Sequence, residues 1–172
     1  MGHESAGVVV ACGENVTRFK PGDRVAMGGD VPCGECVFCE AGIGNNCQTN
    51  YALGYQFPGS FAEYVLLNRI VVNHGPVHRV PDHVSFEEAA FVAIGAIAMQ
   101  GVRQAAPTLG ETIVVMGLGL VGQITVQIAR AAGCHVIGSD PVATRRDLAI
   151  RFGADAACAP GELNAVADEW TA

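Results

Sequence analysis

The sequence predicts a fold of the β and α/β classes, in which a short-stranded β domain is followed by a doubly wound parallel sheet. Two observations favour this fold. Up to about residue 85, short apolar runs alternate with glycine and proline turns and no helical period appears. From Glu111 to Asp140 the pattern becomes strand, glycine turn, helix and strand, which is the unit of a parallel sheet. We therefore place residues 1–85 in one domain and residues 86–172 in a second.

The composition is that of a folded chain with much buried surface. Of 172 residues, 50% are hydrophobic and only 16% charged, and the net charge is −7 with Lys20 as the only lysine. The sequence contains no basic stripe, which argues against nucleic acid or an anionic membrane as partner. The longest apolar run, Ala89 to Met99, is too short to cross a bilayer. Met1 is not followed by a secretory leader pattern, so we expect a cytoplasmic protein.

The first segment, from Gly2 to Met27, favours β structure. Val8 to Val10 predicts a strand, and Arg24 to Met27 predicts another after the turn at residues 21–23. His3 and Glu4 are adjacent at the start of this segment. A single His-Glu pair is weak evidence for a metal site, because such pairs are more often found on protein surfaces.

Four cysteines lie close together in the next segment, which we define as the cysteine lobe, residues 32–48. They form a CxxCxxC pattern followed by seven residues and a fourth cysteine: Cys33, Cys36, Cys39 and Cys47. Four thiolates in one short loop can close a tetrahedron around Zn²⁺, and a closed site has a structural role because it leaves no position for substrate. An iron–sulfur cluster or four free thiols are the alternatives. The other three cysteines, which are isolated in apolar surroundings, are predicted core residues: Cys12, Cys134 and Cys158.

Between residues 51 and 81 the pattern again favours β structure. Phe61 to Leu67 predicts a strand, and Ile70 to Val72 predicts a second one. Three histidines lie in loop-like sequence and are expected at the surface rather than as metal ligands: His74, His78 and His83.

A helix is predicted to begin at Ser85, because Ser85 and Glu88 have the spacing of a capping box. Apolar residues continue on nearly all its faces to Val102, as expected for a helix wedged between two domains, and Pro107 ends it.

The stretch from Glu111 to Asp140 predicts a dinucleotide site. A strand, Thr112 to Met116, leads into a GxGxxG turn and a helix, and a second strand, His135 to Gly138, leads to the acid Asp140. The turn comprises Gly117, Leu118, Gly119, Leu120, Val121 and Gly122. Phosphates would bind at the helix N-terminus, and Asp140 would accept hydrogen bonds from a ribose 2′-OH, which favours NAD over NADP. The alternative is a glycine-rich corner of another α/β domain.

The last part of the chain predicts one more strand. A helix is expected from Pro141 to Gly153, a third strand within residues 154–159, and a weakly helical tail after Gly161.

Taken in order along the chain, these motifs resemble the zinc-containing medium-chain dehydrogenase/reductase superfamily, which includes alcohol, polyol and threonine dehydrogenases. The motifs are GHESAG, PGDRV, the four-cysteine lobe, GSFAEY, the SFEEAA helix and GLGLVG, ending at Asp140. The resemblance implies a GroES-like β domain joined to a Rossmann domain. It implies NAD and zinc as cofactors, a small alcohol, aldehyde or ketone substrate, and a homo-oligomeric full-length parent.

The resemblance also assigns roles to particular residues. His3 is similar to a catalytic zinc ligand. Glu4 beside it is similar to a carboxylate that supports such a ligand or replaces it, and the four cysteines are similar to structural zinc ligands. Gly117, Gly119, Gly122 and Asp140 match the NAD site, and Arg145 is expected near the adenosine ribose. In relatives a catalytic cysteine lies upstream of the GHE motif and a further Cys or Glu follows the SFEEAA helix start. A Rossmann domain has about six strands, against about three expected in this sequence. We therefore expect an incomplete copy of such an enzyme.

Three functions remain open from the sequence. The first is an NAD-dependent alcohol or polyol dehydrogenase. The second is a non-catalytic module that keeps structural zinc and nucleotide affinity. A zinc-ribbon nucleic-acid binder is the third, and the acidic charge balance argues against it.

Overall fold

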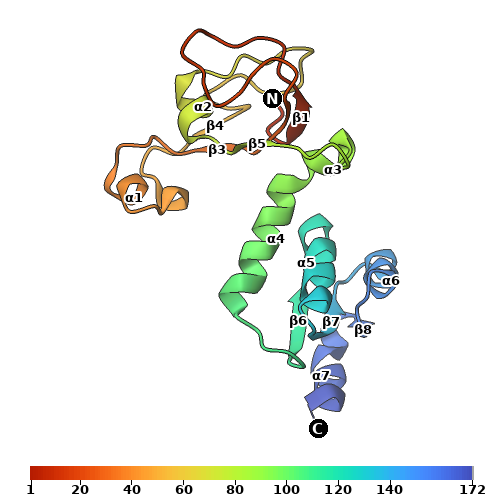
Figure 1. Cartoon of the computed structure of the whole chain (residues 1–172). Coiled ribbons are helices and arrows are strands. Elements are labelled where there is room, and N and C mark those ends of the chain that lie inside the picture. The colour runs from red at the N-terminus through yellow and green to blue at the C-terminus, as the bar shows by residue number, and fades with distance from the viewer. Residues whose placement is uncertain (172) are drawn as a thin grey trace. The chain divides into compact units, whose positions relative to one another are not determined.

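The structure is a computed structural model that describes residues 1–171 (Figure 1). Its contacts divide the chain into two compact units, of which the first is Met1–Ala93 and the second begins at Ile94. The division falls inside helix α4 (Val92–Ala105), whereas the sequence places the domain boundary between residues 85 and 86.

The first unit contains two small antiparallel sheets. The larger has the strand order β1–β2–β5, with Ala6 opposite Ala26 and Ala26 opposite His78. The smaller pairs β3 with β4. The strands are β1 (Ser5–Val8), β2 (Arg24–Met27), β3 (Asp30–Val31), β4 (Tyr51–Ala52) and β5 (Val77–Arg79). A core of buried apolar side chains lies between these sheets and the loops: Phe19, Val25, Met27, Val31, Leu53, Val71 and Val77.

Short helices complete the first unit. The cysteine lobe holds α1 (Val37–Glu40) and the 3₁₀ turn η1 (Gly44–Asn46), and α2 (Arg69–His74) precedes β5. Helix α3 (Phe86–Ala90) begins as the sequence predicts, since the Ser85 hydroxyl accepts from the Glu88 N–H and the Glu88 carboxylate accepts from the Ser85 N–H. The predicted helix is not continuous, because Phe91 ends α3 and a new helix, α4, begins at Val92.

Three strand predictions in the first unit need correction. Strand β1 ends at Val8, so that Val9 and Val10 lie outside it. Residues 61–67 form no strand and belong to no ladder among the described residues. The Phe61 N–H donates to the Met1 carbonyl at 3.0 Å, and the Phe61 side chain is 84% exposed. Residues 70–72 belong to helix α2, because the Asn68 side chain caps its start by accepting from the Val71 N–H at 3.0 Å.

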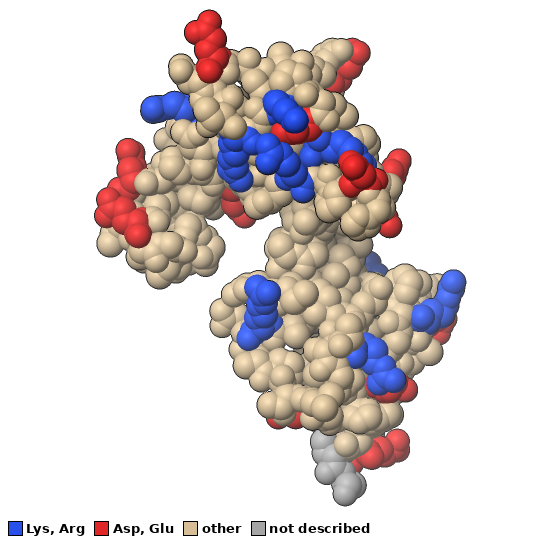
Figure 2. All heavy atoms as spheres, viewed as in Figure 1, with Lys and Arg blue, Asp and Glu red and all other residues tan. Residues whose placement is uncertain are grey.

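Arginine side chains hold distant segments of the first unit together. The guanidinium of Arg24 donates to the carbonyls of Pro81 and Val84, and that of Arg18 donates to the carbonyls of Val72 and Val77. Basic side chains gather on the face of this unit seen in Figure 2, with acidic side chains among them. The donors of these two arginines are bonded to main-chain carbonyls, so their role in the structure is to tie segments together.

The second unit is built around a parallel sheet with the order β6–β7–β8, in which Ile113 pairs with Val136 and Gly138 with Ala157. Parallel strands need crossover connections, which the helices between them supply. The elements after α4 are β6 (Thr112–Met116), α5 (Leu120–Ala131), β7 (His135–Ser139), α6 (Ala143–Arg151), β8 (Ala156–Cys158), η2 (Pro160–Glu162) and α7 (Leu163–Thr171). The strand–turn–helix–strand prediction is thus confirmed, as is a third strand.

The core of the second unit lies between the sheet and its helices. It is formed by fully or nearly fully buried side chains, including Leu118, Val126, Ala129, Cys134, Val136 and Ala149. Cys134 and Cys158 are buried as predicted, whereas Cys12 in the first unit is only partly buried. Among the described residues, no helix is both long enough and apolar enough to cross a membrane.

Candidate functional site

The four cysteines of the lobe converge on one point. Their sulfur atoms all lie within 4.8 Å of one another, with Cys36 and Cys39 sulfurs 3.5 Å apart and Cys33 and Cys39 sulfurs 3.9 Å apart. A tetrahedral zinc with Zn–S bonds of about 2.3 Å separates its sulfur ligands by about 3.8 Å. The arrangement therefore fits Zn²⁺ without rearrangement of the backbone, and a closed four-sulfur shell has a structural role.

Two features of the backbone bring the cysteines together. Gly34 and Gly42 adopt positive φ angles of 86° and 75°, which side chains disfavour, and so allow the chain to fold back on itself. The N–H groups of Cys33 and Asn50 point at the Cys47 sulfur, at 3.2 and 3.3 Å. These two N–H groups make the surroundings of the Cys47 sulfur favourable for a thiolate.

The lobe favours charged sulfur at two of its positions. Hydrogen bonds from the backbone of Cys33 and Asn50 lower the pKa of Cys47 to about 6. A backbone hydrogen bond from Gln48 lowers the pKa of Cys36, while burial raises the pKa of Cys39 to about 11. Thiolates are the form that binds metal, and a bound cation would favour ionisation of the remaining thiol as well.

His3 and Glu4 do not form a comparable centre. The Nε2 atom of His3 lies 4.0 Å from a carboxylate oxygen of Glu4, both side chains are more than a third exposed, and the His3 ring is 5.9 Å from that of Tyr55. Among residues 1–171, only the four cysteines form a group of three or more metal-binding side chains. The described residues therefore do not fit a catalytic zinc at His3. His74, His78 and His83 are exposed, as predicted.

Each glycine of the turn in the second unit is there for a different structural reason. Gly117 has a φ of 89°, and a Cβ at Gly122 would collide with the Gly117 carbonyl. Gly119 has an ordinary φ of −71°, and a Cβ there would meet no atom within 4 Å. Neither the backbone conformation nor the packing of the chain requires glycine at position 119. What a glycine provides there is open space at the start of α5.

The first turn of α5 is suited to an anion. Gly119 is its N-cap and offers no side-chain acceptor to the helix N–H groups, which therefore remain available to a ligand together with the helix dipole. Leu120 and Val121, which follow, are 51% and 41% exposed. A pyrophosphate group fits this arrangement of an uncapped helix start beside an unfilled glycine position.

Asp140 is bonded to the turn rather than free. It lies at the end of β7 with 2% of its surface exposed, and its two oxygens accept from the N–H groups of Leu118 and Val142, each at 2.8 Å. These two backbone bonds, that of Val142 first, lower the pKa of Asp140, and the Arg145 guanidinium 3.6 Å away acts in the same direction. The acid is therefore ionised and anchored. A carboxylate has about four acceptor positions, of which the backbone bonds use two and the Arg145 guanidinium faces a third.

Gln123 is a residue of this site that the sequence analysis does not identify. Its side-chain amide donates to the carbonyls of Leu118 and Arg145, at 3.0 and 2.8 Å, and the side chain is buried. Together with the contacts of Asp140, these bonds close a ring of four residues, the turn ring: Leu118, Gln123, Asp140 and Arg145. Glutamine is an ordinary helix former, so its position directly after the third glycine was the only available signal.

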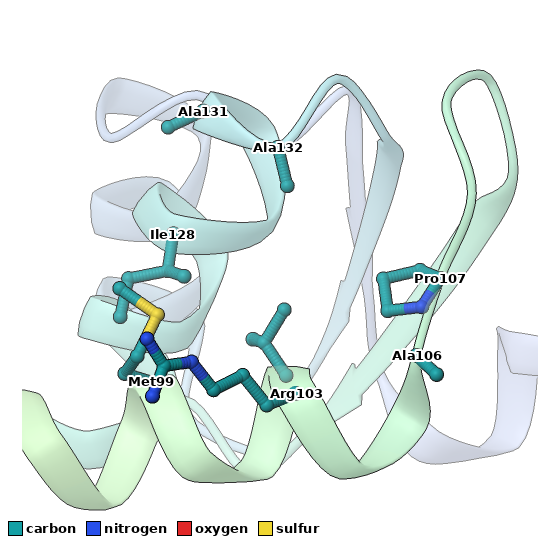
Figure 3. A pocket seen from close by; sticks show the side chains of 8 residues that line it. Met99, Arg103, Ala106, Pro107, Ile128, Ala131 and Ala132 are labelled. Atoms are coloured by element: carbon teal, nitrogen blue, oxygen red, sulfur yellow. The ribbon is translucent and has the colours of Figure 1, made fainter.

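The second unit contains two mostly apolar hollows. One, of about 480 Å³, lies between the ends of α4 and α5, where Met99 and Ile128 face each other beside Arg103 (Figure 3). The other, of about 400 Å³, runs along β6 and reaches the turn at Gly117 and Gly122. Both have mostly apolar walls, and the second is lined in part by Gly117, Val121 and Gly122 of the glycine turn.

Comparisons with known proteins agree with this geometry. Residues 1–82 match the profile of the alcohol dehydrogenase GroES-like domain, and residues 121–172 match that of the zinc-binding dehydrogenases. The chain is 37% identical over 170 residues to the "Probable D-xylulose reductase A" of Aspergillus clavatus, covering 98% of this chain and 46% of that protein.

Two solved structures are similar over nearly the whole chain. A "putative zinc-binding dehydrogenase" of Sinorhizobium meliloti 1021 bound to NADP superposes with a TM-score of 0.84 at 36% identity, covering 92% of this chain and 45% of that one. A protein of Escherichia coli CFT073 described as a "short chain alcohol dehydrogenase", complexed with NADH, gives a TM-score of 0.87 at 30% identity, covering 99% of this chain and 50% of that one. The chain thus spans about half the length of the relatives it matches. By its two profile matches, its fold and its cysteine lobe, the chain belongs to the zinc-containing medium-chain dehydrogenase/reductase superfamily.

Proposed function

We propose that this chain carries the nicotinamide nucleotide site and the structural zinc lobe of an oxidoreductase that transfers hydride between an alcohol or polyol and NAD. The observation that carries the proposal is the open Gly119 position at the uncapped start of α5, beside the anchored carboxylate of Asp140. The four cysteines of the cysteine lobe would hold a zinc ion with a structural role. When bound, the nicotinamide ring accepts or donates the hydride, and the residues of this chain bind and orient the adenosine half.

The preference for NAD rests on charge. Asp140 lies at the end of β7 with a lowered pKa, and a carboxylate there would repel a 2′-phosphate while accepting hydrogen bonds from a ribose hydroxyl. Arg145, 3.6 Å from Asp140, is the nearby cation that would instead favour NADP. One similar structure holds NADP and another NADH, so the two cofactors need to be compared directly.

Titration of the purified chain with NADH and with NADPH, followed by nicotinamide fluorescence, tests the proposal. We expect saturable binding of NADH, with NADPH weaker by about tenfold or more. The absence of binding to either nucleotide would refute the nucleotide site, and tighter binding of NADPH would refute the role of Asp140.

A second function is favoured by one observation, namely that His3 and Glu4 find no third metal-binding side chain among residues 1–171. This second function is that of a module that binds structural zinc and a nucleotide but catalyses no hydride transfer. One zinc per chain, NADH binding and no hydride transfer from any polyol would favour this function. Hydride transfer by the purified chain would exclude it.

A further inference from the structure

We propose that Gln123 is a positioning residue of the nucleotide site, which fixes the glycine turn in the conformation that a dinucleotide binds. This inference rests on the proposed function, because it concerns how the same site is shaped. Its basis is the turn ring, in which both polar groups of Leu118 are held by side chains. The Leu118 N–H donates to Asp140 and the Leu118 carbonyl accepts from the Gln123 amide.

The bond to the Leu118 carbonyl also orients the next N–H group along the chain. The Leu118 carbonyl and the Gly119 N–H belong to one planar trans peptide, in which the two groups point in opposite directions. Gln123 draws the carbonyl toward the buried interior of the unit. The Gly119 N–H therefore points away from the Gln123 amide. The space beside Gly119 is open, since a Cβ there would meet no atom within 4 Å.

The second bond of Gln123 connects the turn to α6. The other hydrogen of its amide is donated to the Arg145 carbonyl at 2.8 Å, and the Arg145 guanidinium lies 3.6 Å from the Asp140 carboxylate. One buried amide thus holds a backbone carbonyl of the glycine turn and one of α6. The amide orientation is fixed by these two acceptors, and its oxygen has no partner among the described residues.

Replacement of Gln123 by a side chain without donors would release both carbonyls at once. Leu118 is 1% exposed and Gln123 is 5% exposed, so water does not readily replace the lost bonds, and the turn is expected to rotate to regain a donor. Such a rotation would turn the Gly119 N–H away from a bound dinucleotide, while the rest of the site would remain in place.

The test compares Gln123→Leu with Gln127→Leu in the full chain. Gln127 is on the same helix one turn later, is exposed, and donates only to the Gln123 backbone carbonyl at 3.2 Å. We expect Gln123→Leu to raise the Kd for NADH and for ADP-ribose about tenfold, and Gln127→Leu to change either by less than twofold. Both are measured well below the melting temperature of each variant.

Gln123→Glu supplies a second readout that a purely structural role would not produce. A protonated carboxyl can donate one of the two lost bonds, whereas a carboxylate can donate none. NADH affinity of this variant is expected to rise as the pH falls, relative to the unmodified chain. If the unmodified chain binds NADH and both Gln123 variants bind it equally well at all pH values, the inference is wrong while the proposed function stands. If the unmodified chain binds neither nucleotide, both are wrong.

Discussion

The imidazole of His74 covers the backbone of Gly34, so that a Cβ on Gly34 would lie 2.5 Å from Nε2 and 2.7 Å from Nδ1 of the ring. His74 is the last residue of α2, and Gly34 lies between the first two cysteines of the lobe. A helix that the sequence analysis did not predict therefore packs its terminal side chain against the metal-binding loop. Burial raises the pKa of the Cys39 thiol, and the Gly34 backbone acts in the opposite direction, so the Gly34 peptide lies where it favours charge on that sulfur.

Gly34→Ala should accelerate zinc release, because the added methyl group would displace either the His74 ring or the Gly34 peptide that favours charge on the Cys39 sulfur. The measurement is the rate of zinc transfer to a chromophoric chelator. Gly42→Ala is the matched control, since Gly42 has a similar φ of 75° but open space at its Cβ. We expect release from Gly34→Ala to be several times faster than from the control. His74→Ala combined with Gly34→Ala should recover part of the difference, and equal rates in the two single variants would contradict the packing argument.

Cys39→Ser should reduce the zinc content from one ion per chain to none, because a hydroxyl does not replace a thiolate in a four-sulfur shell. Elemental analysis of the purified protein measures this, with Cys12→Ser as control, since Cys12 is in the same unit but outside the lobe. Two zinc ions in the unmodified chain, one of which survives Cys39→Ser, would show that His3 and Glu4 acquire further ligands.

Gly119→Ala should weaken NADH binding with little loss of stability, whereas Gly122→Ala should lower the stability of the second unit. A methyl group at Gly119 meets nothing in the chain, so the melting temperature should change little, with a capping cost of about 0.5 kcal/mol, while NADH affinity falls. At Gly122 a methyl group would collide with the Gly117 carbonyl, and overpacking of this kind costs about 1–3 kcal/mol. Thermal unfolding and NADH titration of both variants distinguish them. A Gly119→Ala protein that binds NADH normally would mean that the open space is not the nucleotide site.

Asp140→Asn should remove a contribution to the stability of the second unit that is present at neutral pH and is lost in acid. Because the folded-state pKa of Asp140 is lowered from the ordinary 3.8, its contribution is fully present above the unfolded-state value and is lost as the pH falls through the lower folded-state value. The free energy of unfolding should therefore differ between Asp140→Asn and the unmodified chain at pH 6, and the two should converge in strong acid. Asp147→Asn, exposed on α6, is the control. Parallel curves for Asp140→Asn and the unmodified chain over the whole range would refute the anchoring role.

The sequence predicts those parts of the structure that depend on neighbouring residues. The capping box of Ser85 and Glu88, the cysteine lobe and the glycine turn are all local patterns, and each appears where expected. Residues 61–67 are rich in apolar and aromatic side chains, as strands are, but a strand also needs a partner strand, which local composition does not report. Residues 70–72 are β-branched and apolar, yet the cap at Asn68 starts a helix through them.

The turn ring shows why the site was only partly predictable. Leu118, Asp140 and Arg145 belong to a recognisable motif, whereas Gln123 takes part only because α5 and α6 lie close enough for its amide to bond to both Leu118 and Arg145. That proximity is a property of the packed unit. A buried glutamine one residue after a glycine turn is a signal that can be sought in other sequences of this type.

The contacts of the two units differ in how far they reach along the chain, which has a consequence for the order of folding. The Arg24 bonds span 57 and 60 residues, whereas the Leu118 bond to Asp140 spans 22. Short-range contacts form faster because less chain must be closed into a loop. The cysteine lobe lies within the long connection between β2 and β5, so a zinc ion bound early would shorten that loop before the strands meet. We expect the second unit to refold at a rate independent of zinc, and the first unit to refold faster when the metal is present from the start.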